Sequence, residues 1–452
     1  MDSLRSYSSI TEWPTDFIPK DAYISAEFAR LEKERLWPTQ WLLACREEDI
    51  TKPGQFVTFE IADESIVITR DNDNKLRAYF NVCPHRGRRL LEGCGQTARF
   101  FCRFHGWQWK LDGSNHVMMD SGDWQNLSPD DVRLKDVRVD TWAGFVFVNI
   151  DGKAEPLLDY LSPWPEMWET YRMQDMRYRW FKQTRLNCNW KVAIEAFLEG
   201  YHAQTTHRQV NGANGGNLYS CRVFGRHSMF YDRVLKRMGT PNPNSSLLPP
   251  SETPEAALPS DFRELIAAYL ETVATDLGCQ VTEHMVEAAK RLPERVGEDA
   301  EYMDVMRALR ALHVEIAAEH GVRWDHLPME DMQALGVGWH MFPNIALLAT
   351  PDGLVMYRAR PDGDNPDKCL FEVFPLQRYA PGDEPKVERE FHEDWREGDF
   401  PKIFRQDFEN CAFVQAGMKS SSFQGAFPNP LAEKTIYNFH RELHRIVTDG
   451  ER

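Results

Sequence analysis

The sequence lacks any apolar stretch long enough to cross a bilayer. Its longest apolar stretches, such as residues 144–150, are far shorter than the roughly 20 residues that a membrane-spanning helix needs. Residues 1–13 are too polar for a targeting segment, and neither an internal repeat nor a low-complexity segment is present. These absences predict a cytoplasmic protein that does not enter a membrane.

Basic residues are too few to balance the acidic ones. The chain has 53 Lys and Arg against 69 Asp and Glu, a formal net charge of -16, so neither nucleic acid nor an anionic membrane offers it a counter-charge. Its nine cysteines are spread singly along 452 residues, which fits a reducing compartment rather than a disulfide framework. The length and a hydrophobic content of 42% allow two or three domains.

Two short pairs of metal-binding residue types stand out against this background. Cys83 and His85 are separated by one residue, and Cys102 and His105 by two. Two thiolates can bind one iron of a two-iron cluster while two imidazoles bind the other, which is the ligand set of a Rieske centre and raises its reduction potential. The pattern therefore predicts a [2Fe-2S] electron carrier.

A structural zinc ion is the alternative, because two cysteines and two histidines also form a tetrahedral zinc site. Zinc fingers usually place both cysteines before both histidines, whereas here each pair supplies one of each and is followed by a glycine, Gly87 or Gly106. The extra disulfide of respiratory Rieske centres is impossible, since Arg88 and Phe104 occupy its two positions. The pattern resembles the ferredoxin and oxygenase type of Rieske centre.

Short alternating segments surround the two pairs and predict a small all-β domain over residues 39–155. The predicted strands, separated by Asp, Asn and Gly turns, are residues 56–61, 65–70, 76–81 and 142–150. Residues 1–38 are predicted to be a partly helical N-terminal segment that packs on the larger domain, residues 156–452. Pro156 and the aromatic stretch after it mark the boundary.

The larger domain carries a second candidate metal site. His202 and His207 follow Glu199 and lie five positions apart, so they do not share one helix face, but a helix that ends between them can aim both imidazoles at one point. With one distant carboxylate they form the set that binds non-haem ferrous iron and leaves open positions for dioxygen. Two histidines at this spacing are by themselves more often a surface feature. In a chain that also carries an electron-transfer cluster, a metal site at these histidines is favoured, because the electrons need an acceptor.

With these residues in view, the chain is similar over nearly its whole length to the catalytic α subunits of Rieske non-haem iron oxygenases, the ring-hydroxylating oxygenase family. The segments Asn81-Val-Cys-Pro-His-Arg-Gly87 and Cys102-Arg-Phe-His-Gly-Trp107 resemble the family's two cluster loops. Asn189-Trp-Lys191, leading to Glu199-Gly-Tyr-His202 and His207, resembles its iron-binding segment.

The resemblance implies a third iron ligand far downstream. The family places an aspartate there, ahead of a Gln-x-Gly segment, and residues 406–417 match this pattern. Asp407 is therefore the expected ligand beside His202 and His207. Gln406 stands where the family usually has an acid, and Glu409 is a nearby competitor. A solvated acidic turn is the structural alternative.

The resemblance also implies a role for Glu199. At this position the family carries a carboxylate that bridges an iron-binding histidine and a cluster histidine of the neighbouring subunit, and such an acceptor orients both imidazoles for electron transfer. Aspartate is commoner there. Glutamate resembles members that act on quaternary ammonium compounds such as choline or carnitine. Glu195, on the same stretch, is expected to be solvated on the helix surface.

For the larger domain the resemblance implies an α+β fold of the helix-grip type, an antiparallel sheet curled around a helix. Strand character is found in residues 337–342, 345–350, 355–360 and 368–375, with a turn at Pro343-Asn344. Apolar spacing in residues 258–333 predicts a helical insertion with stops at Gly278 and Gly321. It either covers the substrate entrance or packs on its own domain or a neighbouring subunit. Residues 211–248, rich in Gly, Asn, Ser and Pro, read as a loop.

The function that the resemblance implies is that of a terminal oxygenase component. Electrons from NADH or NADPH reach the [2Fe-2S] cluster through a ferredoxin or flavin reductase and pass to ferrous iron, where O2 is used to hydroxylate a small substrate. A homotrimer, with or without a small β subunit, is also implied. A Rieske carrier without catalysis and a zinc-stabilised binding module remain as other classes.

Two reactions fit such an oxygenase. The first is dihydroxylation of an aromatic or other hydrophobic, carboxylated substrate, for which Arg208, Arg222 and Arg226 are candidate anion partners near the iron segment. The alternative is monohydroxylation or demethylation of a quaternary ammonium or other non-aromatic compound.

Overall fold

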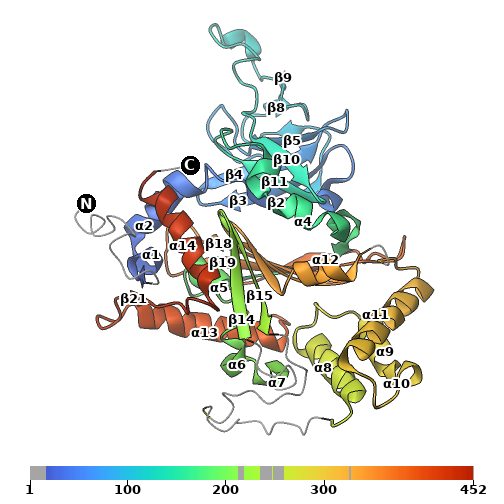
Figure 1. The fold of residues 1–452 in the computed structure, drawn as a ribbon. Coiled ribbons are helices and arrows are strands. Elements are labelled where there is room, and N and C mark those ends of the chain that lie inside the picture. The colour runs from blue at the N-terminus through green and yellow to red at the C-terminus, as the bar shows by residue number, and fades with distance from the viewer. Residues whose placement is uncertain (1–16, 212–217, 235–246, 248–258, 325–326, 451–452) are drawn as a thin grey trace. The chain divides into compact units, whose positions relative to one another are not determined.

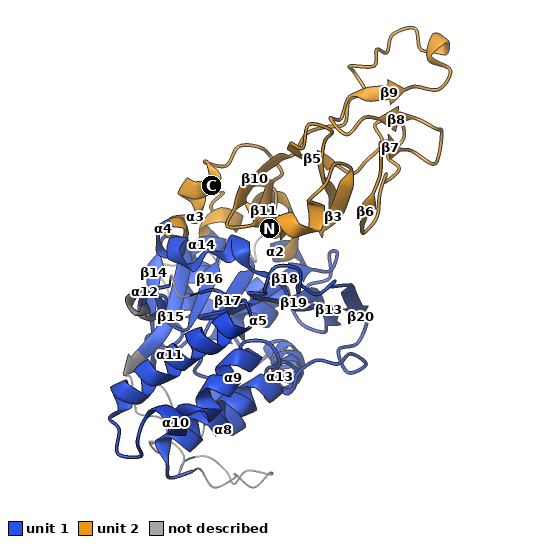
Figure 2. Ribbon diagram, turned by 90° about the vertical axis from the view of Figure 1, so that its right-hand side faces the viewer, with its two compact units in different colours: residues 1–28, 166–444 blue, residues 29–165, 445–452 orange. Residues whose placement is uncertain are grey.

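The computed structural model describes residues 17–211, 218–234, 247, 259–324 and 327–450. The first sixteen residues of the predicted N-terminal segment and much of the predicted loop 211–248 lie outside the described residues. Two compact units are present (Figure 2): unit 2 comprises residues 29–165 and 445–452, and unit 1 comprises residues 1–28 and 166–444. The domain boundaries predicted from the sequence stay a prediction.

Unit 2 is built from three small antiparallel sheets. The first contains β3 (Gln55–Ile61), β4 (Glu64–Arg70), β5 (Leu76–Phe80) and β6 (Cys94–Gln96); the second β7 (Phe100–Phe101), β8 (Gln108–Trp109) and β9 (Asn115–Val117); the third β2 (Leu42–Arg46), β10 (Arg138–Trp142) and β11 (Phe145–Asn149). Three predicted strands are confirmed. The fourth, 142–150, is wrong at its start, because Ala143 and Gly144 adopt positive φ (51° and 82°) and form the turn between β10 and β11.

An aromatic core supports the two cysteine–histidine loops of unit 2. Tyr79, Phe100 and Trp109 are fully buried and pack in one cluster with Cys83 and Cys102. The polar atoms of this core are paired: the Trp109 indole donates to the carbonyl of residue 132 at 2.7 Å and the Tyr79 hydroxyl to that of residue 111 at 3.1 Å. The two loops are therefore anchored on a packed core in which the polar atoms of Trp109 and Tyr79 are paired.

Unit 1 is organised around a nine-stranded sheet (Figure 1). Its strands are β12 (Arg177–Tyr178), β13 (Phe181–Leu186), β14 (Leu218–Phe224), β15 (His227–Val234), β16 (Gly338–Met341), β17 (Ile345–Thr350), β18 (Gly353–Pro361), β19 (Cys369–Gln377) and β20 (Arg389–His392). The four predicted strands and the turn at Pro343-Asn344 are confirmed. The loop prediction for 211–248 is wrong where β14 and β15 pair as a hairpin.

Helices lie on this sheet and confirm the mixed α+β class. Their bounds are α5 (Trp190–Glu195), α6 (Ala203–Thr206), α7 (Arg208–Asn211), α13 (Lys402–Met418) and α14 (Lys434–Val447). Helix α5 packs on β18 and β19 and against α13. On α14, the Phe439 ring packs on Trp190 of α5 and His340 of β16. Near the N-terminus, β1 (Ile18–Pro19) pairs with β21 (Gly425–Ala426), followed by α1 (Asp21–Ile24), α2 (Ala26–Leu31) and a π-helical turn (Glu32–Leu36).

The predicted insertion is helical. It contains α8 (Phe262–Asp276), α9 (Glu283–Lys290), α10 (Leu292–Arg295), α11 (Tyr302–Glu319) and α12 (Met329–Ala334). Gly278 and Gly321 follow α8 and α11 with positive φ (66° and 74°), as expected of helix stops. The insertion is tied to the sheet of its own unit by Asp352, whose carboxylate accepts from Thr282 at 2.5 Å and contacts His313 at 2.8 Å.

None of the helices in the described residues is both long and apolar enough to span a membrane.

A buried ion cluster joins the two central strands of the sheet. Glu372 of β19 faces Arg358 of β18 in register and contacts Arg360 two residues further on, at 3.1 Å. All three side chains are buried. Burial disfavours the carboxylate, but the two guanidinium groups outweigh it and lower the pKa of Glu372 to about 2. Removing one partner of such a cluster leaves buried charge uncompensated.

We expect Glu372→Gln to lower the free energy of unfolding by about 3–5 kcal/mol at neutral pH. The folded-state pKa of about 2 lies below the reference value of 4.5, so the carboxylate stabilises the fold above pH 4.5 and loses this contribution as the pH falls toward 2. Denaturation at several pH values should show the difference from wild type shrinking below about pH 4.5. Glu393→Gln, which breaks an exposed pair with Arg185, should cost less than about 1 kcal/mol; equal losses in both variants would contradict the assignment.

Candidate metal centres

The two cysteine–histidine loops of unit 2 have the same backbone shape. In each, a glycine N–H donates to the cysteine carbonyl four residues earlier: Gly87 to Cys83 at 2.9 Å and Gly106 to Cys102 at 3.0 Å. Both glycines have positive φ, 75° and 76°, which a side chain disfavours. The glycines noted in the sequence thus close two equivalent turns.

These turns bring all four predicted cluster residues together. The thiols of Cys83 and Cys102 are buried next to each other, and the rings of His85 and His105 lie 4.6 Å apart between centroids. His85 stacks on Trp107, at 4.8 Å, and Trp124 contacts both rings edge-on. The packing of Trp107 and Trp124 on His85 was not predicted from the sequence, although Trp107 is the last residue of the second loop motif.

The chemistry of this donor set fits a [2Fe-2S] cluster. Burial, with the adjacent Cys102 thiol, raises the pKa of Cys83, so a thiolate there needs a cation beside it. Desolvation and the neighbouring His105 lower the pKa of His85, which keeps that imidazole neutral and able to bind metal. The buried Nδ1 of His105 has no hydrogen-bond partner among the described residues. A metal ion would satisfy all three groups.

The second centre lies in unit 1, where α6 is a single helical turn between the two candidate histidines. His202 is the residue before the helix and His207 the residue after it. At His207 the backbone leaves the helical region (φ -114°, ψ 49°), and the two rings meet edge-on at 5.1 Å. The expected break between the histidines is therefore present and turns both imidazoles toward one point.

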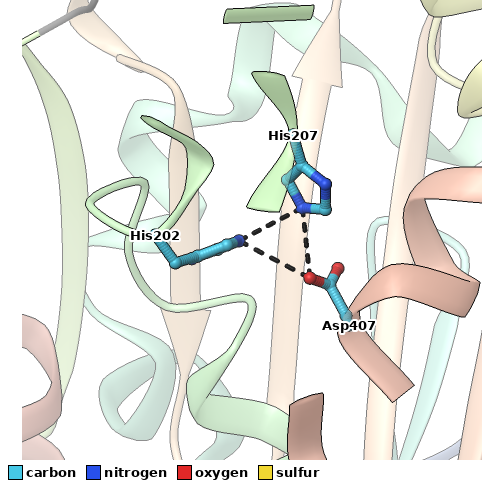
Figure 3. A group of neighbouring side chains, drawn as sticks. All are labelled: His202, His207 and Asp407. Carbon is cyan, nitrogen blue, oxygen red and sulfur yellow. Dashed lines mark hydrogen bonds and ion pairs between the residues drawn. The ribbon is translucent and has the colours of Figure 1, made fainter. Parts of the chain in front are cut away.

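Asp407 approaches the same point from α13 (Figure 3). Its Oδ1 lies 3.1 Å from His207 Nε2 and 3.7 Å from His202 Nε2, and the two Nε2 atoms are 3.3 Å apart. Three donors that bind one ion at about 2.1 Å on one face of an octahedron lie about 3 Å from one another. The arrangement fits a two-histidine, one-carboxylate metal site. Its competitor Glu409 is exposed, whereas Asp407 is buried.

Each imidazole is held by a hydrogen bond at Nδ1, the ring nitrogen that does not face the other candidate ligands. Glu199 Oε1 contacts His202 Nδ1 at 2.5 Å, while its other oxygen accepts the backbone N–H groups of Tyr201 and His202. On the other ring, His207 Nδ1 lies 3.0 Å from Oε1 of Gln406, which also accepts from Gln209 at 3.0 Å. Both histidines are thereby held with Nε2 free to bind metal.

The role of Gln406 was missed by sequence analysis, which noted only that this residue replaces an acid. Because α13 places Gln406 next to Asp407, one helix supplies both a candidate ligand and the partner of another ligand. A neutral amide orients His207 without adding charge. Because Glu199 and Asp407 already bring two carboxylates to the site, an amide at Gln406 adds less electrostatic repulsion than a third carboxylate would.

The electrostatics of the site favour a cation. Burial opposes a charged His202 ring, but the carboxylates of Glu199 and Asp407 outweigh it and raise the pKa of His202 to about 9. The same negative groups would stabilise a divalent metal ion in place of the proton.

Glu195 is not solvated, contrary to expectation. Its carboxylate contacts His440 Nε2 at 2.6 Å and accepts from the Tyr23 hydroxyl at 3.1 Å. These partners come from α14 and α1, so Glu195 of α5 ties three helices together. This role could not be predicted from the sequence, because Tyr23 and His440 lie 172 and 245 residues from Glu195 along the chain.

The position of α13 also depends on a buried polar contact. Asn189 caps α5 through a hydrogen bond from the N–H of Lys191, at 3.1 Å. Its own N–H donates to the Gln415 side chain of α13 at 2.9 Å. The Asn-Trp-Lys motif therefore starts one helix and docks the helix that carries Asp407.

Two family models match the chain. One, described as a Rieske [2Fe-2S] domain, matches residues 40–122. The other, described as the catalytic domain of the ring hydroxylating alpha subunit, matches residues 168–268 and 279–449, more than half of the chain.

Curated relatives cover part of the sequence. The carnitine monooxygenase oxygenase subunit of Acinetobacter pittii is 31% identical over 215 residues, which are 44% of this chain and 57% of that protein. The anthranilate 1,2-dioxygenase large subunit of Acinetobacter baylyi is 30% identical over 224 residues, 44% of this chain and 46% of that protein. The chain spans about half the length of the curated relatives it matches.

Solved structures share the fold over nearly the full length. A quaternary ammonium Rieske monooxygenase is 18% identical, with a TM-score of 0.64 and coverage of 96% of this chain and 95% of that one. Naphthalene 1,2-dioxygenase from Rhodococcus sp. is 17% identical, with a TM-score of 0.61 and coverage of 99% and 96%. Together with the two family models, these findings confirm that the chain belongs to the α subunits of the Rieske non-haem iron oxygenases, the ring-hydroxylating oxygenase family.

Proposed function

We propose that this chain is the terminal component of an oxygenase, which hydroxylates a small molecule with O2 and electrons delivered from NADH or NADPH by a reductase or ferredoxin. The observation that carries the proposal is the convergence of His202, His207 and Asp407 in a chain that also has a Rieske domain. A Rieske carrier without catalysis would have no use for this second donor set.

Each group of residues has a distinct task in this proposal. Cys83, Cys102, His85 and His105 would hold the [2Fe-2S] cluster, and His202, His207 and Asp407 the mononuclear iron. When bound, the cluster supplies single electrons, and ferrous iron with open positions activates dioxygen. Glu199 and Gln406 orient the two imidazoles of the iron site by holding their Nδ1 atoms.

Glu199 has a second part in the proposal. Its side chain is 7% exposed, and its two oxygens are used by His202 and by backbone N–H groups of the same segment. We propose that it also accepts a hydrogen bond from a cluster histidine of a neighbouring protomer in a homotrimer, as the resemblance implies. A reductase or ferredoxin as electron donor belongs to the same proposal.

For the reaction, we favour monohydroxylation of a quaternary ammonium compound. Glu199 and relatives named carnitine and choline monooxygenase support it. Dihydroxylation of an aromatic acid is the second candidate, supported by a relative named anthranilate 1,2-dioxygenase. One candidate anion partner for this reaction, Arg222, is exposed and lies over the Tyr231 ring at 4.8 Å. An exposed guanidinium group in this position does not support binding of a buried carboxylate substrate.

We expect Asp407→Ala to abolish mononuclear iron binding and turnover while leaving the cluster absorption unchanged, because two imidazoles alone bind ferrous iron weakly. Metal analysis should fall from three irons per chain to two. Glu409→Ala removes an exposed carboxylate two residues away and should keep the third iron. Retention of that iron in Asp407→Ala, or its loss in Glu409→Ala, would contradict the ligand assignment.

Glu199→Gln should retain both metals yet slow turnover by about 10- to 100-fold, because an amide is a weaker partner for the His202 ring. The informative measurement is single-turnover reoxidation of the reduced cluster, followed by its absorption. Glu64→Gln, at an exposed residue of β4, is a matched control. An unaltered reoxidation rate in Glu199→Gln would remove this residue from the electron path.

Isotope-labelled dioxygen separates the two reactions. Monohydroxylation should place one labelled atom in the product and the other in water, whereas a cis-diol retains both atoms of one O2 molecule. Choline, carnitine, anthranilate and naphthalene would be tested for substrate-dependent oxygen uptake before mass analysis. Two labelled atoms in an aromatic product would overturn our preference for the monooxygenase reaction.

A further inference from the structure

A single acidic residue of the β14–β15 hairpin faces the iron-binding segment. Asp232 of β15 is paired directly with Tyr219 of β14, and side chains of directly opposed residues lie on the same face of a sheet. The Tyr219 ring packs so closely on Gly200 that an added Cβ there would lie 2.6 Å from it. Gly200 separates Glu199 from Tyr201, two residues before His202. Asp232 therefore lies on the hairpin face that contacts the metal-binding segment.

One oxygen of the Asp232 carboxylate is buried without a partner, while the residue as a whole is partly exposed. Its Oδ1 has no accessible surface and no hydrogen-bond partner among the described residues. Burial raises its pKa to about 6, and no cationic side chain offsets the effect. Two buried carboxylates of unit 1 are paired, in contrast: Glu372 has two guanidinium groups, and Asp352, whose Oδ1 also has no partner, contacts His313 and Thr282 through Oδ2.

Tyrosine side chains lie near this carboxylate, and no described one donates a hydrogen bond to its buried Oδ1. Tyr269 of α8 and Tyr302 of α11 lie close enough that burial and the Asp232 charge together raise the pKa of both hydroxyls. The Tyr302 ring packs on Phe262 at 5.3 Å, and Tyr219 on Phe230 at 5.8 Å. The helical insertion thus contributes rings to the same place as the hairpin.

A negative charge among aromatic rings is suited to one class of ligand. A cation with an apolar surface gains from the carboxylate by Coulomb attraction and from the rings by cation–π contact, and it requires no hydrogen-bond acceptor. An anionic group would be repelled, and a neutral hydrocarbon would leave the buried charge uncompensated.

We propose that Asp232, with the rings of Tyr219, Tyr269 and Tyr302, forms a subsite for the alkylated ammonium group of the substrate. This inference rests on the proposed function, because it places the ammonium group on the hairpin face beside the segment that carries His202. The helical insertion acquires a role in substrate selection, since two of the rings come from α8 and α11.

The test compares choline with its neutral isostere, in which a quaternary carbon replaces the ammonium nitrogen. Binding is measured calorimetrically on the anaerobic, iron-loaded enzyme, without reductant. Wild type should bind choline at least about tenfold more tightly than the isostere. Asp232→Asn, similar in size, should bind both with affinities within about twofold of each other. Its melting temperature should not fall, because the variant loses no ion pair.

Two controls keep the result specific. Asp299→Asn removes an exposed charge from the same insertion and should keep the full preference, as should Tyr302→Phe, which preserves the ring. Equal affinities in wild type, or an unchanged preference in Asp232→Asn, would overturn the subsite.

Failure of the subsite and failure of the proposed function can be told apart. Equal binding of the two probes by a protein that holds three irons and consumes oxygen with another substrate would remove the subsite alone. A choline preference that depends on Asp232 in a protein lacking the mononuclear iron would support the subsite and remove the oxygenase.

Discussion

The proposed function of this chain depends on one geometric constraint: three donor atoms from two distant segments must each lie about 2.1 Å from a common point. His202 and His207 come from the ends of α6, and Asp407 comes from α13, with Nε2–Oδ1 distances of 3.7 and 3.1 Å. The hydrogen bond from Asn189 to Gln415 docks α13 on the start of α5. A shift of α13 would separate the carboxylate from both imidazoles, so the packing of these helices is part of the metal site.

Orientation of the donors is a second requirement, and it is met by neighbours of opposite character. Glu199 holds His202 with a charged carboxylate, while Gln406 holds His207 with a neutral amide. Two carboxylates in these places, beside Asp407, would put three negative charges around one ion. With a neutral amide at Gln406, the negative charge around the ion is lower and both rings are still fixed. In the cluster loops, the donors are oriented by two equivalent glycine turns and by the Trp107 indole stacked on His85.

The parts of the site that sequence could predict are those set by local spacing. The two cysteine–histidine loops and the break between His202 and His207 follow from residues within a few positions of each other. Asp407 was found only through the resemblance, because it lies 200 residues from His207. The partners of Gln406 and Glu195 could not be predicted, since they depend on how α13, α14 and α1 pack. The strands β14 and β15 were hidden by the Gly- and Asn-rich composition that flanks them.

Compensation of buried charge connects these features. In unit 1, Glu372 is neutralised by two arginines and Asp352 is paired with His313, and the charge of Asp407 would be balanced by the metal ion that its geometry fits. Asp232 has no such partner among the described residues. Burying a carboxylate oxygen without a partner costs stability unless a ligand completes the pair. An aromatic acid would add a second negative charge and a neutral ring would add none, whereas a cationic substrate would supply the missing charge.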